Sequence, residues 1–116
     1  MKVVFHIDEP EKWKLGLTNA KNMAAYYESK GQGYTIEVLS NSGAVQQLVQ
    51  AYARATGLED DLQMLSDKGV VFAACNNALT SQKIAPETLF PFVVVVPAGV
   101  VELAEKQANG YAYIKP

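Results

Sequence analysis

The chain has 116 residues, of which 49% are hydrophobic and 19% are charged, so it is long enough to bury one core and too short for two. Its formal net charge of -2 and pI near 5.3, with no run of lysines or arginines, offer no basic field to nucleic acid or to an anionic membrane. The longest apolar stretch, residues 89–101, is interrupted by prolines, and a bilayer span needs about 20 apolar residues. We therefore expect one domain over residues 1–116, without a membrane segment or a nucleic-acid partner.

Apolar patterning in the first half of the chain predicts strands that alternate with helices. Residues 2–7 are rich in β-branched and aromatic side chains and end at a proline-bearing turn, which is typical of a strand that leads into a helix. Apolar residues recur every three or four positions over 11–30, which predicts an amphipathic helix. A second strand is expected over 34–39, followed by the turn Ser40–Gly43. Two helical pieces come next, one over Val45–Tyr52 and one over Leu58–Leu65.

The same alternation continues through the second half. Residues 70–74 form an apolar run that predicts a central strand with Cys75 at its carboxyl end, and a short helix is expected over 78–83. Residues 92–96 are apolar without alternation, as expected of a strand covered on both faces by helices. The chain then continues through the turn Pro97–Gly99, a helix over 100–108 and a last strand over 111–114.

This order implies a parallel five-stranded sheet with right-handed crossovers and helices on both faces, which is a three-layer α/β/α sandwich. In such a sheet every turn that follows a strand opens on the same edge, where α/β proteins bind their ligands. The turns expected to cluster at that edge are residues 8–11, 40–43, 75–77 and 97–99.

Cys75 is the main candidate for a catalytic residue because it is the only cysteine and falls at a strand-to-helix turn. The free N–H groups and the dipole of a following helix favour the reactive thiolate. Cysteine is also among the most buried residue types, so a structural role is the alternative. A lone cysteine forms no internal disulfide, which fits a reducing compartment, and the apolar stretch near Met1 is too short for a signal peptide. We therefore expect a cytoplasmic protein.

Other polar residues of these turns are candidates for holding an anion. Asn76 and Asn77 either orient a bound sulfur or oxyanion species or simply form the turn. Asn41 and Gly43 either offer N–H groups to an anion or cap the next helix. His6, the only histidine, is a possible base for the thiol. If the second strand lies between the first and third, two spacings of about 4.8 Å put His6 out of direct reach, which favours a structural histidine.

Several motifs are absent. There is no glycine-rich dinucleotide or P-loop signature followed by a helix and no Gly-x-Ser-x-Gly elbow. With one cysteine and one histidine a zinc site has no recognisable ligand spacing. The scattered acids are interpreted as solvated faces and helix starts, and we expect no metal and no organic cofactor.

Three stretches together resemble the small DsrE/DsrF-like proteins, and the resemblance runs along nearly the whole chain. These stretches are Lys2–Ile7, Gly69-Val70-x-Phe72-x-x-Cys75-x-Asn77-x-Leu79, and Gln107-x-x-Gly110-Tyr111-x-Tyr113-Ile114-Lys115-Pro116. The resemblance implies an α/β/α sandwich around a five-stranded parallel sheet, and homo-oligomers such as trimers or hexamers. In sulfur-relay members, the cysteine that matches Cys75 accepts sulfane sulfur as a persulfide and passes it on.

Three functional hypotheses follow. The first is a sulfur carrier or sulfurtransferase in which Cys75 holds the sulfur and Asn77 and nearby N–H groups steady the anion. Because the chain has no second cysteine, donor and acceptor thiols belong to partner proteins. The second is a non-enzymatic oligomeric module that binds a small anion or regulates, with a structural cysteine and with the turns at Ser40–Gly43 and Pro97–Gly99 as ligand contacts. The third is a redox sensor that uses sulfenic acid chemistry at Cys75. Whether Trp13 and Tyr113 lie at an interface or in the cleft stays open.

Overall fold

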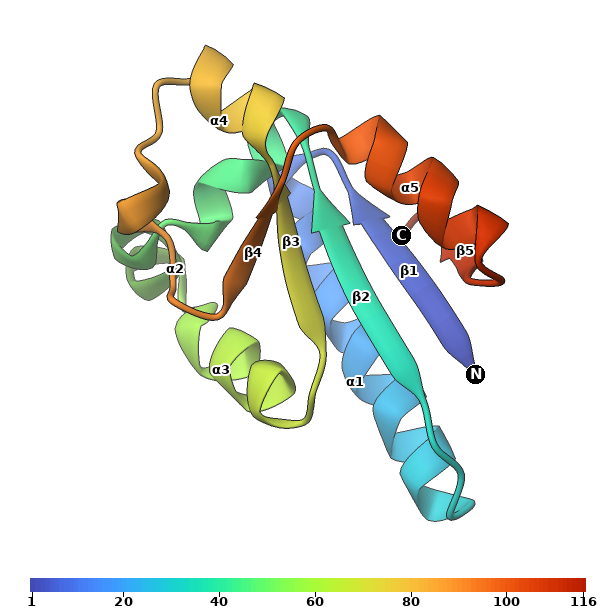
Figure 1. Cartoon of the computed structure of the whole chain (residues 1–116). Coiled ribbons are helices and arrows are strands. Elements are labelled where there is room, and N and C mark those ends of the chain that lie inside the picture. Colours follow the sequence, from blue (N-terminus) through green and yellow to red (C-terminus); the bar gives the residue numbers. More distant parts are fainter.

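A five-stranded sheet forms the centre of the computed structural model, which describes all 116 residues (Figure 1). The strands are β1 (Lys2–Ile7), β2 (Thr35–Ser40), β3 (Val71–Cys75), β4 (Val93–Val96) and β5 (Ala112–Ile114). They lie in the order β4-β3-β2-β1-β5, and all four neighbouring pairs are parallel. The predicted five-stranded parallel sheet is therefore confirmed.

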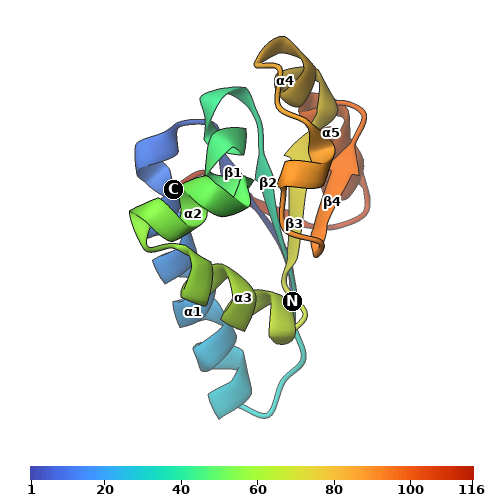
Figure 2. The ribbon, with the colours of Figure 1, turned by 90° about the vertical axis from the view of Figure 1, so that its left-hand side faces the viewer.

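Helices cover both faces of the sheet and make it the middle of three layers (Figures 1 and 2). The helices are α1 (Trp13–Ser29), α2 (Gln50–Thr56), α3 (Glu59–Asp67), α4 (Asn76–Ser81) and α5 (Gly99–Ala108), with short 3-10 turns η1 (Pro10–Lys12), η2 (Ser42–Leu48) and η3 (Pro86–Thr88). Helices α1 and α3 pack on one face, and α5 packs on the other. The predicted α/β/α sandwich is confirmed. No helix is long and apolar enough to cross a bilayer.

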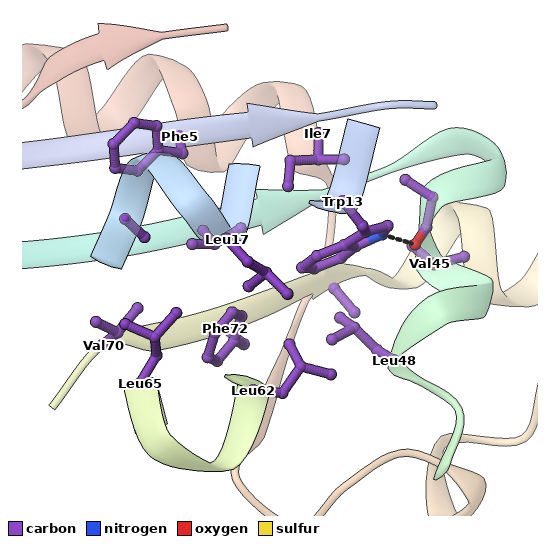
Figure 3. Close-up of a cluster of buried hydrophobic side chains, with 14 of the residues drawn as sticks. Phe5, Ile7, Trp13, Leu17, Val45, Leu48, Leu62, Leu65, Val70 and Phe72 are labelled. Atoms are coloured by element: carbon purple, nitrogen blue, oxygen red, sulfur yellow. Dashed lines mark hydrogen bonds between the residues drawn. The ribbon is translucent and has the colours of Figure 1, made fainter. Parts of the chain in front are cut away.

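The larger core lies between the sheet and α1, α3 and η2 (Figure 3). Side chains alternate along β1, so that Phe5 enters this core while Val4 enters a smaller one beneath α5. Trp13 is 1% exposed, and its indole Nε1 donates a hydrogen bond to the Ala44 carbonyl at 2.7 Å. Trp13 therefore belongs to the core and lies neither at the surface nor in a cleft.

The predicted helix over Val45–Tyr52 is wrong, because the chain breaks in the middle of it. Residues 42–48 form the 3-10 turn η2, and Val49 is extended with φ -72° and ψ 127° before α2 begins. The backbone here bonds to another segment: the Leu48 carbonyl accepts the Phe90 N–H at 3.3 Å, and Val49 bridges Leu89. These long-range bonds replace the helical ones that the apolar spacing alone predicts.

The expectation that residues 92–96 are covered on both faces is also wrong. Strand β4 is an edge strand, and its Val94 and Val95 are 49% and 38% exposed. Helix α5 packs mainly over β1 and β2, and its Leu103 reaches β3 and β4 only at Ala73 and Val96. The rest of β3 and β4 carries no helix on that face (Figure 1). The exposed Val71 of β3 belongs to the same bare area, because it shares a sheet face with Val94.

Candidate functional site

The carboxyl ends of three strands bring predicted site residues together at one edge of the sheet. Cys75 ends β3, Asn41 follows β2, and Gly99 begins α5 just after β4. A Cβ atom built on Gly99 would lie 3.2 Å from Asn41 Cβ and 3.3 Å from Cys75 Cβ. The missing side chain of Gly99 is therefore what allows α5 to start against the cysteine turn.

Cys75 is itself part of the strand, whereas the predicted strand ended at residue 74. It is the last residue of β3, pairs with Val96 of β4, and directly precedes α4 as its N-cap residue. Its side chain forms no capping hydrogen bond to the first turn of α4. The residue is 6% exposed, so the thiol belongs to the buried side of this sheet edge.

The remaining predicted residues differ in how close they lie to this centre. Asn76 and Asn77 form the first turn of α4 and are both exposed. Gly43 lies elsewhere, since a Cβ built on it would meet Pro10 at 3.6 Å and no atom of Cys75 within 4 Å. The turn itself is tied to α4, because the Gln82 amide donates to the Ser42 carbonyl at 2.7 Å.

His6 is hydrogen-bonded on both ring nitrogens. Strand β2 lies between β1 and β3, so the predicted separation of His6 from the thiol is confirmed, and no hydrogen bond joins them. Its Nε2 lies 2.9 Å from Asn41 Oδ1, and its Nδ1 lies 2.7 Å from the Tyr113 hydroxyl. Sequence reasoning missed this group, because only the sheet order places β5 beside β1 and β1 beside the turn after β2.

Glu37 is a buried carboxylate that the sequence interpretation assigned to a solvated face. It is 5% exposed in the middle of β2, and burial, together with the Glu102 charge, raises its pKa to about 7. Lys106 Nζ lies 3.7 Å from its Oε1, while Oε2 is buried without a hydrogen-bond partner. A glutamate inside the apolar strand was the signal in the sequence. Glu37 pairs with Val71 at the start of β3, about 13 Å along the sheet from Cys75, and so lies outside the site.

The side chains at the sheet edge suit thiol chemistry supported by amides and backbone N–H groups. No group of three or more His, Cys, Asp or Glu side chains lies close enough together to hold a metal ion. The nearest titratable ring, His6, meets Asn41 and not the sulfur. Cys75 therefore lies directly before the first turn of α4, and no side-chain base is bonded to it.

Comparisons with known proteins agree with this fold and show the family to which the chain belongs. The model of the DsrE/DsrF-like family matches residues 1–116, and the chain belongs to that family. Among solved structures, it is similar to MTH1491 from Methanobacterium thermoautotrophicum, a protein of unknown function, with 32% identity and a TM-score of 0.86 over 99% of this chain and 98% of that one. The ychN protein from E. coli has the same fold, with 17% identity and a TM-score of 0.76 over 100% and 99% of the two chains. No curated protein matches the chain.

Proposed function

We propose that the protein is a sulfur carrier that accepts sulfane sulfur as a persulfide on Cys75 and passes it to the thiol of a partner protein. The observation that carries the proposal is the position of the only cysteine, at a strand end beside Asn41, Gly99 and the first turn of α4. Membership of the DsrE/DsrF-like family, which is associated with sulfur relay, supports it.

The transfer consists of two displacements at sulfur. The Cys75 thiolate attacks the terminal sulfur of a donor persulfide R–S–SH, so that a Cys75 S–S bond forms, the donor S–S bond breaks, and the donor leaves as the thiolate RS⁻. An acceptor thiolate then attacks the terminal sulfur on Cys75, takes it as a new persulfide, and regenerates the Cys75 thiolate. No net oxidation occurs, and the proton stays with the transferred sulfur.

The neighbouring residues stabilise the anionic sulfur in this proposal. Asn77, Asn76 and Asn41 supply amide donors, and the uncapped first turn of α4 supplies backbone N–H groups. Both partner thiols come from other molecules, since the chain has no second cysteine. We place this activity in the cytoplasm, where thiols stay reduced.

We further propose that the chain works as a trimer or hexamer. The support is the bare half of the sheet face beside α5, which we call the valine face. Its members are Val71 and Val94, exposed by 37% and 49%, and Val101 of α5, exposed by 52%, borders it next to Val96. Exposed apolar clusters of this kind are typical of protein–protein contacts, and a second copy of the chain offers the same apolar surface.

Mass spectrometry tests the carrier proposal directly. The protein is incubated with a low-molecular-weight persulfide and digested, and we expect one added sulfur atom on the peptide that contains Cys75. Cys75→Ser should show no gain, and an added acceptor thiol should remove the sulfur from the wild type. A wild-type thiol that is alkylated by iodoacetamide yet gains no sulfur would contradict the proposal.

One observation favours the alternative function, which is that of a non-enzymatic module with a small-anion-binding or regulatory role. Cys75 is only 6% exposed, which also suits a packed structural thiol. In that case Cys75→Ser destabilises the fold while the wild type acquires no sulfur. The same digest therefore separates the two functions.

A further inference from the structure

All five α-helices of the chain end in the same turn, and only one of these turns is built without a glycine. After each helix, one backbone N–H bonds to the carbonyl three positions back and the next N–H to the carbonyl five positions back, at 2.9 to 3.4 Å. The first of these two residues takes the left-handed conformation that glycine adopts most easily. After α4 this residue is Lys83, with φ 57°. After α1, α2, α3 and α5 it is a glycine, namely Gly31, Gly57, Gly69 and Gly110.

The fold itself gives no reason for a lysine at position 83. A side chain in the left-handed region crowds the backbone carbonyl that follows it, so glycine is the better residue for the turn. The Lys83 ammonium forms no ion pair, whereas five other basic side chains of the chain are each paired with a carboxylate. Residues held in such unfavourable conformations cluster at functional sites. The side chain of Lys83, with its free positive charge, is therefore the feature to explain.

Lys83 lines a cavity of about 320 Å³ that lies beside α2. The cavity opens where the segment after α4 returns alongside η2 and α2 (Figure 1). Two of its apolar lining residues, Val49 and Ile84, also pack against the larger core, and the bridge between Val49 and Leu89 joins the two walls. The volume falls at the lower end of the range for small-molecule sites, which suits a small ligand.

The polar groups of this cavity are complementary to an anion. Lys83 is the only charged residue that lines it, and Glu87 of the same segment does not. Gln46 and Tyr52 also line it, and the bonds that they form elsewhere in the chain use their backbone carbonyls, so the side-chain amide and the hydroxyl are free to donate. One cation, two neutral donors and apolar walls match a ligand with a single negative charge and an apolar body.

We propose that this cavity binds a small carboxylate with an apolar body. The Lys83 ammonium pairs with the carboxylate, while Val49, Ile84 and the ring of Tyr52 contact the apolar part. Lys83 follows the carboxyl end of α4, whereas Cys75 precedes the amino end of the same helix. The site is therefore separate from the thiol, and the proposal does not depend on the sulfur-carrier function.

Titration with hexanoate, followed through the backbone N–H signals by nuclear magnetic resonance, tests the proposal. In the wild type we expect saturable shift changes that are confined to residues 46–52 and 83–88. Hexan-1-ol has the apolar body without the charge, and it should bind at least tenfold more weakly. Inorganic phosphate has the charge without the apolar body, and it should cause no saturable change at these residues over the same range of concentration.

Three variants separate the role of the ammonium from an effect on the fold. Lys83→Gly should bind hexanoate at least tenfold more weakly, because it removes a charged hydrogen-bond donor. It should unfold at the same or a higher urea concentration than the wild type, because glycine suits the turn. Lys83→Arg keeps the charge and should keep most of the affinity. The control is Lys30→Ala, which removes an exposed lysine at the end of α1 and should bind as the wild type does.

A wild type without saturable changes on addition of hexanoate would overturn the proposal. Equal affinity of the wild type and Lys83→Gly for hexanoate, or equal affinity of the wild type for hexanoate and hexan-1-ol, would overturn it as well. Unfolding of Lys83→Gly at a lower urea concentration would show that the lysine serves the fold, which also contradicts the proposal. None of these measurements involves Cys75, so a failure of sulfur uptake leaves their result standing.

Discussion

Asn41 and Cys75 pack against the same glycine, although they follow different strands. A Cβ atom on Gly99 would lie 3.2 Å from Asn41 Cβ and 3.3 Å from Cys75 Cβ, and the first turn of α5 closes over both. The glycine therefore sets how closely the helix approaches the candidate site.

Substituting Gly99 should disturb the fold and the thiol together. The added methyl group of Gly99→Ala meets three neighbours closer than ordinary van der Waals contact, so we expect a loss of about 1–2 kcal/mol in the free energy of unfolding. Urea denaturation measures this loss, and the plateau rate of Cys75 alkylation should change with it. The matched control is Gly33→Ala, where a Cβ meets nothing within 4 Å. Equal stabilities of the two variants would contradict this account of Gly99.

Glu37 makes the stability of the fold depend on pH. Its pKa is raised from 4.5 to about 7 in the folded protein, so between these values the unfolded chain releases a proton that the folded chain keeps. Stability should therefore fall as pH rises from about 4.5 to 7 and level off above, by up to about 3 kcal/mol. Glu37→Gln removes this slope and should be the more stable protein at pH 8.

Urea denaturation from pH 4.5 to 8 checks this prediction. Glu105→Gln, an exposed change on α5, is the control and should keep the wild-type slope. A Glu37→Gln profile parallel to that of the wild type would show that another group causes the pH dependence.

The valine face should govern assembly. Val94→Lys places a charge on a side chain that is 49% exposed in the single chain, so the fold should survive while contacts between copies are lost. Light scattering after size exclusion should give the mass of a trimer or hexamer for the wild type and of a monomer for Val94→Lys. Leu15→Lys, on α1 and 46% exposed, should leave the assembly intact. A monomeric wild type at micromolar concentration would contradict the assembly proposal.

Trp13 should be a main contributor to stability. Trp13→Phe leaves a cavity in the larger core and removes the bond to the Ala44 carbonyl, so we expect a loss of roughly 2–3 kcal/mol. Circular dichroism during urea denaturation measures it, because the variant lacks the only tryptophan. Tyr26→Phe, on an exposed ring, should stay within about 0.5 kcal/mol of the wild type. A similarly small effect of Trp13→Phe would contradict the assigned role.

The strands and long helices were predictable because their signals are local. Residues 2–7 were predicted as a strand and are β1, and the helix expected over 11–30 contains α1. The errors occur where distant segments intervene. Val49 is extended because it bridges Leu89, and Val94 of the edge strand β4 is exposed because α5 packs mainly over β1 and β2. Neither contact can be predicted from the local spacing of apolar residues.

The sequence by itself determined the alternation of strands and helices, the parallel sheet, and the presence of one cysteine at a strand-to-helix turn, because periodicity and turn residues act over a few positions. Only the tertiary structure decided the strand order, and with it which side chains meet. It placed Tyr113, His6 and Asn41 in one hydrogen-bonded chain, brought Gly99 against Cys75, and buried Glu37 beneath α5. Contacts between residues far apart in the chain depend on how whole elements pack, and that packing is a property of the complete fold.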